Sequence, residues 1–165
     1  TMSATIVVIL GEPEWTQRAL HLSAALAREW RAAVTLVKML PVAHLEYLGA
    51  GVGETLLSYT ESCYLQECAA TVESYGVPTD LRLFQYSDVV GGVLSAAEQL
   101  DATAVFAPTP TGWLPGQARL RGWWLRRTLG VPLYTLGAGD APLVLALPAT
   151  ADASATGSRP SPALR

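Results

Sequence analysis

The chain has 165 residues, of which 50% are apolar and 15% charged, and its formal net charge is −3. This composition excludes fibrous, collagenous and wholly disordered proteins, and it predicts one globular domain that can bury a substantial core. Lys38 is the only lysine among the 11 basic residues. Nucleic-acid-binding domains are usually strongly basic, so we do not expect a nucleic-acid partner.

Membrane and metal-binding classes also lack support in the sequence. No apolar run approaches the ~18 residues of a membrane span, and no basic stretch precedes a signal-like segment, so we expect a soluble, cytoplasmic protein. Cys63 and Cys68 are five residues apart in a helix-like segment, which favours reduced thiols over a disulfide framework or a zinc site. His21 and His44 have no cysteine or carboxylate at ligand spacing, so we expect no metal.

Strand-like and helix-like segments alternate along the chain. Runs typical of buried strands occur at residues 5–10, 34–40, 81–86, 103–107 and 131–136. Helices are expected at residues 14–31, 55–75, 89–100 and 117–129, with Ser87 or Asp88 as the N-cap of the third. The alternation predicts an α/β, Rossmann-like fold, in which helices cover both faces of a five-stranded parallel sheet.

The sequence after the fifth strand divides into two parts. Residues 142–147 (PLVLAL) follow a Gly-Ala-Gly-Asp spacer. We expect them to form an antiparallel edge strand of the same sheet or to pair with a second subunit. Residues 149–165 consist mainly of Ala, Thr, Ser, Gly and Pro, so we expect a domain over residues 1–148 and a mobile tail after it.

Several segments resemble the universal stress protein family. TQRAL at residues 16–20 is similar to the family's S-E-R-A-L helix opening, and GVP at residues 76–78 precedes the third strand. Residues 93–107 resemble the passage I-L-x-A-A-E-E-x-x-A-D-L-I-V that joins the family's third helix to its fourth strand. The resemblance covers roughly the first 136 residues, and it implies a nucleotide-binding-like fold with ATP bound in one branch of the family. It also implies a homodimer formed through the last strand, here from Val131 to Leu136, with residues 142–147 as a second candidate contact.

The positions that contact ATP in that branch differ in this chain. Gly11, followed by Glu12, stands where the branch has an aspartate at the end of its first strand. The branch also carries G-x-x-G, nine residues, then G-[S/T], whereas Gly112, Gly116 and Gly122 are spaced by four and six residues. Prolines stand among them where backbone N–H donors would be needed. We therefore expect a degenerate nucleotide pocket.

The alternative hypothesis is a changed set of contacts that holds an adenine nucleotide or another anion. Its candidate residues lie in the turn after the first strand, within the second strand, and in the loop and helix after the fourth strand. They are Gly11, Glu12, Lys38, Thr109, Thr111, Arg119, Arg121 and Gly122. The guanidinium groups of Arg119 and Arg121 have the geometry to bind a phosphate or a carboxylate. The simpler interpretation is that these arginines lie on a solvent-exposed face of the helix.

Three further side chains have two interpretations each. Lys38 would either reach the carboxyl edge of the sheet, where ligands of such folds bind, or lie along an edge position with its charge in water. Trp123 and Trp124 would stack on a base or dock a partner, but core or dimer interface is the commoner role.

No catalytic set is present in the sequence. It contains no G-x-S-x-G turn, no group of metal ligands and no base in a convincing context, so we do not expect an enzyme. The first hypothesis is a non-catalytic regulatory or adaptor domain, dimeric and without a cofactor. The second is a small-molecule-binding domain that holds an adenine nucleotide or another anion through non-standard contacts.

Overall fold

The computed structural model describes residues 4–41, 57–108 and 117–136, and only the backbone of residues 117–119, 121–122 and 126. The strands are β1 (Thr5–Ile9), β2 (Ala33–Pro41), β3 (Thr79–Tyr86), β4 (Ala102–Phe106) and β5 (Leu133–Tyr134). The helices are α1 (Pro13–Trp30), α2 (Tyr59–Glu73), α3 (Val89–Gln99) and α4 (Gln117–Leu129). The expected strand at residues 142–147 and tail at residues 149–165 lie outside the described residues.

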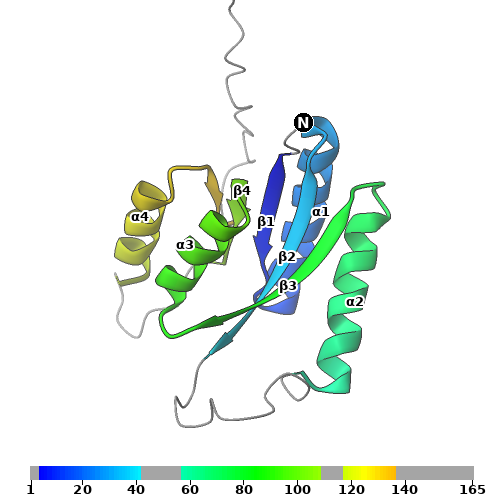
Figure 1. Ribbon diagram of the computed structural model, residues 1–165, viewed down its shortest axis with the longest axis horizontal. Helices are drawn as coiled ribbons and strands as arrows, with labels where there is room; N and C mark the ends of the chain where they lie inside the picture. Colours follow the sequence, from blue (N-terminus) through cyan, green and yellow to red (C-terminus); the bar gives the residue numbers. More distant parts are fainter. Residues whose placement is uncertain (1–3, 42–56, 109–116, 137–165) are drawn as a thin grey trace, which may run out of the picture.

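The five strands form one sheet in the order β3-β2-β1-β4-β5, and every neighbouring pair is parallel. Helices α1 and α2 cover one face of the sheet, and α3 and α4 cover the other (Figure 1). The predicted α/β fold is confirmed. The strand order reverses between β1 and β4, and ligands of such sheets bind at this switch point, outside the carboxyl ends of the strands.

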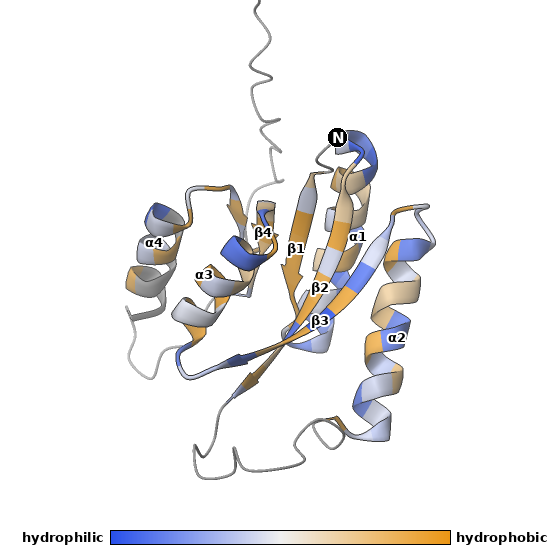
Figure 2. Cartoon of the chain, in the orientation of Figure 1, coloured by the Kyte–Doolittle hydropathy of each residue, from blue (hydrophilic) through white to orange (hydrophobic). Residues whose placement is uncertain are grey.

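The central strand β1 is buried on both faces. Ile6 and Val8 pack into the core under α1 and α2, whereas Val7 and Ile9 pack into the core under α3 and α4. Figure 2 shows β1 as hydrophobic over most of its length. Each such side chain contributes roughly 1.5–3 kcal/mol relative to an exposed one, so β1 holds the two layers of helices together.

Helix α3 lies close to strands β2 and β3 because one of its residues has no side chain. A Cβ atom on Gly92 would lie 2.8 Å from Cβ of Tyr86 and would also meet the end of the Met39 side chain. The helix begins where Asp88 accepts a hydrogen bond from the N–H of Gly91, 2.9 Å away. Of the two N-caps considered, the structure therefore selects Asp88.

Two elements differ from their predicted bounds for clear reasons. Helix α2 begins at Tyr59 and not at residue 55, because Ser58 and Glu61 form a capping box in which each side chain binds the other's backbone N–H. Strand β5 has two residues rather than six. Pro132 has no N–H to donate, and Leu136 has φ 51°, outside the extended region.

Candidate functional site

The switch point is occupied by side chains of the protein itself. Gly11 follows β1 and Pro108 follows β4. A Cβ atom on Gly11 would lie 2.9 Å from Cγ of Pro108, 3.2 Å from its Cβ and 3.6 Å from Cε3 of Trp15. The proline ring thus occupies the space that a side chain at position 11 would need.

The backbone N–H of Gly11 already has a partner. It donates to the Thr16 hydroxyl oxygen, 3.0 Å away, and Thr16 is fully buried in the first turn of α1. A phosphate at such a turn is held by free N–H groups, and this donor is used inside the protein.

The start of α1 is also unfavourable for an anion. Its N-cap, Glu12, makes no side-chain capping bond, its first residue is Pro13, and Glu14 follows in the first turn. Proline offers no N–H donor. The two carboxylates lie at the positive end of the helix dipole, where a bound phosphate would repel them.

Trp15 connects the start of α1 to the end of the edge strand β5. Its indole N–H donates to the backbone carbonyl of Thr135, at 2.7 Å. Beside it, the rings of Phe106 and Tyr134 stack with centroids 4.8 Å apart, and burial raises the pKa of Tyr134. We call Gly11, Trp15, Thr16 and Pro108 the β1–β4 plug, since they pack where β1 and β4 end.

Lys38 lies near the carboxyl end of β2, because the preceding Val37 pairs with Ile9, the last residue of β1. Strand β2 is flanked by β1 and β3, so the alternative of an edge position is wrong. Leu36 packs under α1 and α2 while Val37 packs under α3 and α4, and strand alternation therefore puts the Lys38 side chain on the α1–α2 side. There its charge helps to lower the pKa of Glu61, after the larger effect of the hydrogen bonds from Ser58.

The other predicted residues are placed only in part. The plug contains Gly11, and Glu12 adjoins it. Thr109 and Thr111 lie outside the described residues. Arg119, Arg121 and Gly122 belong to α4, of which only the backbone is described at these positions.

The tryptophans of α4 are not core residues. Trp123 and Trp124 are exposed, and the helix buries Leu125 instead, so the interpretation as core is wrong. An interface role for the two indole rings stays a prediction.

The described residues contain no group of three or more histidines, cysteines and acids that would hold a metal ion. His21 is hydrogen-bonded to the Tyr75 hydroxyl at 2.7 Å, and His44 lies outside those residues. Cys63 and Cys68 are free thiols, and burial raises the pKa of Cys68. None of the helices in these ranges is long and apolar enough to cross a membrane.

Sequence reasoning did not assign Pro108, Trp15 or Thr16 to the site. One signal was available, because a proline directly after a buried strand lies at the carboxyl edge of any parallel sheet. Trp15 has the three-to-four spacing with Ala19 and Leu22 that is typical of the apolar face of a helix, and this spacing does not indicate a site. Its bond to Thr135 depends on the strand order.

Comparison with known proteins gives matches among solved structures only, since neither a family model nor a curated protein matches the sequence. A protein of the universal stress protein family from Burkholderia pseudomallei matches with a TM-score of 0.60 and 19% identity, over 84% of this chain and 98% of that chain. The chain has the universal stress protein fold.

Two other neighbours with the universal stress protein fold were solved with nucleotides. The protein from Archaeoglobus fulgidus in complex with dAMP matches with a TM-score of 0.56 and 16% identity, over 82% of this chain and 98% of that chain. A universal stress protein in complex with cAMP matches with a TM-score of 0.58 and 14% identity, over the same shares of the two chains.

Proposed function

We propose that this domain is a non-catalytic regulatory or adaptor module with a degenerate nucleotide pocket. The observation that carries the proposal is the contact between Pro108 and Gly11 at the switch point. An acidic side chain cannot stand at position 11 unless the proline ring moves, so an acidic nucleotide contact from this position and the present placement of Pro108 exclude each other.

The chemistry around the contact supports the same proposal. The Gly11 N–H is bonded to Thr16, Pro13 has no N–H, and Glu12 and Glu14 are negative. A triphosphate placed here would lose its hydration without gaining donors, and it would meet two carboxylates.

We further propose that the domain forms a homodimer through β5. This strand is at the edge of the sheet, and among the described residues it pairs with β4 alone, through Leu133 and Tyr134. Edge strands present unpaired backbone N–H and C=O groups, which a second copy of the strand can pair. The expected contact extends over residues 131–136.

A second candidate function is the binding of an adenine nucleotide or another small anion through a changed set of contacts. It is favoured by the neighbours that hold dAMP and cAMP. Arg119 and Arg121, near the start of α4, would then clamp the anion, with Thr109 and Thr111 as further contacts.

Native mass spectrometry of the freshly purified chain separates these functions. The adaptor proposal predicts a dimer without a retained nucleotide, and no thermal shift with ATP, AMP or cAMP. Roughly one nucleotide mass per chain, or a thermal shift that disappears in R119A/R121A, would refute the adaptor proposal and favour the second. Val89→Ala truncates an exposed aliphatic side chain on α3 and is the control variant. It should change neither the subunit number, nor the retained mass, nor the thermal shift. A monomeric mass would refute the proposed dimer through β5 and would leave the proposal of a degenerate nucleotide pocket standing.

A further inference from the structure

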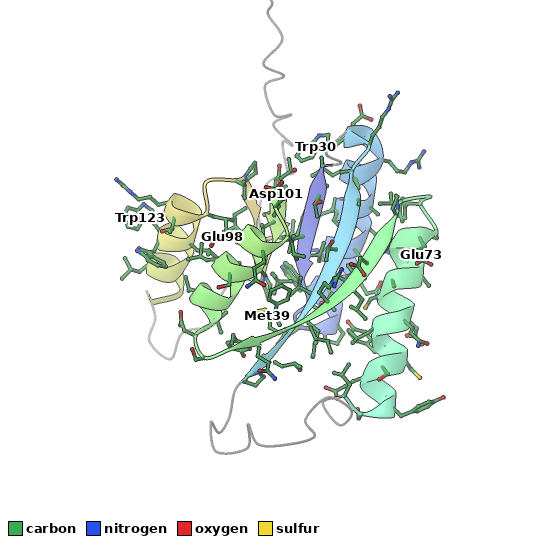
Figure 3. The ribbon with its side chains drawn as sticks, in the orientation of Figure 1. Trp30, Met39, Glu73, Glu98, Asp101 and Trp123 are labelled. Carbon is green, nitrogen blue, oxygen red and sulfur yellow. The ribbon has the colours of Figure 1, made fainter. Side chains whose placement is uncertain are left out.

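Helix α4 carries three large apolar side chains that are exposed. Leu120 is 65% exposed, Trp123 55% and Trp124 48%. Figure 3 shows Trp123 on the side of α4 that is turned away from α3. The Arg127 guanidinium lies over the Trp123 ring, 5.4 Å from its centroid, and orients it. We call Leu120, Trp123 and Trp124 the α4 tryptophan face.

A hollow adjoins this face at the start of the helix. Its volume is about 350 Å³, and its lining comes from Asp88 and Val90 of the α3 N-terminus and from Leu120 and Trp124. An apolar cavity of roughly 150 Å³ is enough to hold a benzene molecule. The hollow can therefore take at least one large aliphatic side chain of whatever covers the face.

The size of the face limits what can cover it. A half-exposed tryptophan leaves roughly 100 Å² in water, so the three side chains together present roughly 300 Å². A stable interface between two folded proteins buries ~800 Å² on each partner. The face is too small for a dimer interface of its own, and it fits a short extended segment.

We propose that residues 142–147 of this chain, PLVLAL, dock on the α4 tryptophan face. The described chain ends at Leu136, buried beyond β5 at the carboxyl edge of the sheet, and α4 begins at the same edge. The five residues 137–141 reach up to about 17 Å when extended, enough to pass around the edge strand. Residues 141–150 include no charged side chain.

The composition of the hexamer suits the face. Pro142 and Pro148 bracket it, and a proline keeps the residue before it extended. Six extended residues span about 20 Å, and so do the 13 residues of α4. Leu and Val side chains can fill the hollow, while the indole N–H groups donate to the carbonyls of the extended segment. This docking is separate from the proposed dimer through β5 and from the nucleotide pocket.

Fluorine NMR of the full chain labelled with 5-fluorotryptophan tests the proposal. The resonances are assigned with W123F and W124F, and the double variant L143D/L145D is compared with the natural sequence. We expect the Trp123 and Trp124 resonances to move toward their positions in the urea-unfolded chain, while those of Trp15 and Trp30 stay in place. Unchanged Trp15 and Trp30 resonances would show that the variant is folded. The control A149D/A151D adds the same charge outside the hexamer and should move no resonance.

Cross-linking identifies which segment covers the face. In a C63S background, air oxidation should convert the two thiols of the L120C/V144C variant into a disulfide between positions 120 and 144. This disulfide can form within one chain or between two chains, and either product supports docking of residues 142–147. If L143D/L145D leaves the Trp123 and Trp124 resonances unchanged, the proposal is wrong. L120C alone forming dimers through its own thiol would also overturn it, because a second α4 would then cover the face. A nucleotide retained in native mass spectrometry would contradict the proposed adaptor function, but it would not test the docking of residues 142–147.

Discussion

Replacing Gly11 by alanine measures how tightly the β1–β4 plug is packed. The added Cβ atom would lie 2.9 and 3.2 Å from two ring carbons of Pro108, closer than ordinary van der Waals contact. Overpacking of this kind costs roughly 1–3 kcal/mol. Gly11 is not among the glycines with positive φ, so alanine should also gain roughly 0.4–1 kcal/mol from a less flexible unfolded chain. The net expectation is a destabilisation of about 1–2 kcal/mol.

Urea denaturation of a double-mutant cycle isolates the contact with Pro108. Gly11→Ala is measured in the natural chain and again in a Pro108→Gly background, where both ring contacts are absent. We expect the substitution to cost at least about 1 kcal/mol less in the second background, with an unchanged m value. Gly91→Ala is the matched control, because a Cβ there meets only Asp88 Oδ2 at 3.4 Å. Equal costs of Gly11→Ala in both backgrounds would refute the assignment of Pro108 to the plug.

Three further predictions concern single groups. The hydrogen bonds from Ser58 lower the pKa of Glu61 from its usual value of 4.5. The ionised Glu61 carboxylate therefore stabilises the folded chain above pH 4.5, and this stabilisation is lost as the pH falls through the lowered pKa. In urea titrations between about pH 5 and about pH 3, the free energy of unfolding should fall less steeply for Glu61→Gln than for the natural chain. Trp15→Phe removes a 2.7 Å hydrogen bond and should lower the free energy of unfolding by about 1 kcal/mol, or Tm by roughly 2–4 °C in calorimetry. With a thiol reagent, Cys63 should react before Cys68, which is buried and has a raised pKa; two thiols of equal rate in the native chain would contradict this.

The order and type of the elements could be predicted because they depend on local periodicity. A continuous apolar run such as residues 5–10 indicates a strand buried on both faces whatever its neighbours are. The start of α2 was predictable too, since Ser58 and Glu61 have the spacing of a capping box. This capping box marks Tyr59, and not residue 55, as the first residue of the helix.

The site depends on contacts that local patterns do not contain. Gly11 and Pro108 meet because β1 and β4 are neighbours, and nothing near either residue in the sequence specifies that pairing. The position of Lys38 depends on the same strand order, which puts β2 inside the sheet. For Trp123 and Trp124, composition alone does not decide which side of α4 faces the sheet, because apolar residues occur around most of that helix.

The strand order also determines when the sheet can close as the chain is synthesised. The N–H of Thr5 donates to the Thr103 hydroxyl, 98 residues further along the chain, so β1 cannot gain its β4 neighbour until β4 has been made. At about 5–20 residues per second, this takes roughly 5 to 20 s. During that time β1, β2 and β3 can already pair, and the open backbone of β1 is available to any other strand. A nascent chain of this protein therefore passes through a stage in which β1, buried on both faces and both edges of the finished sheet, is an open edge strand.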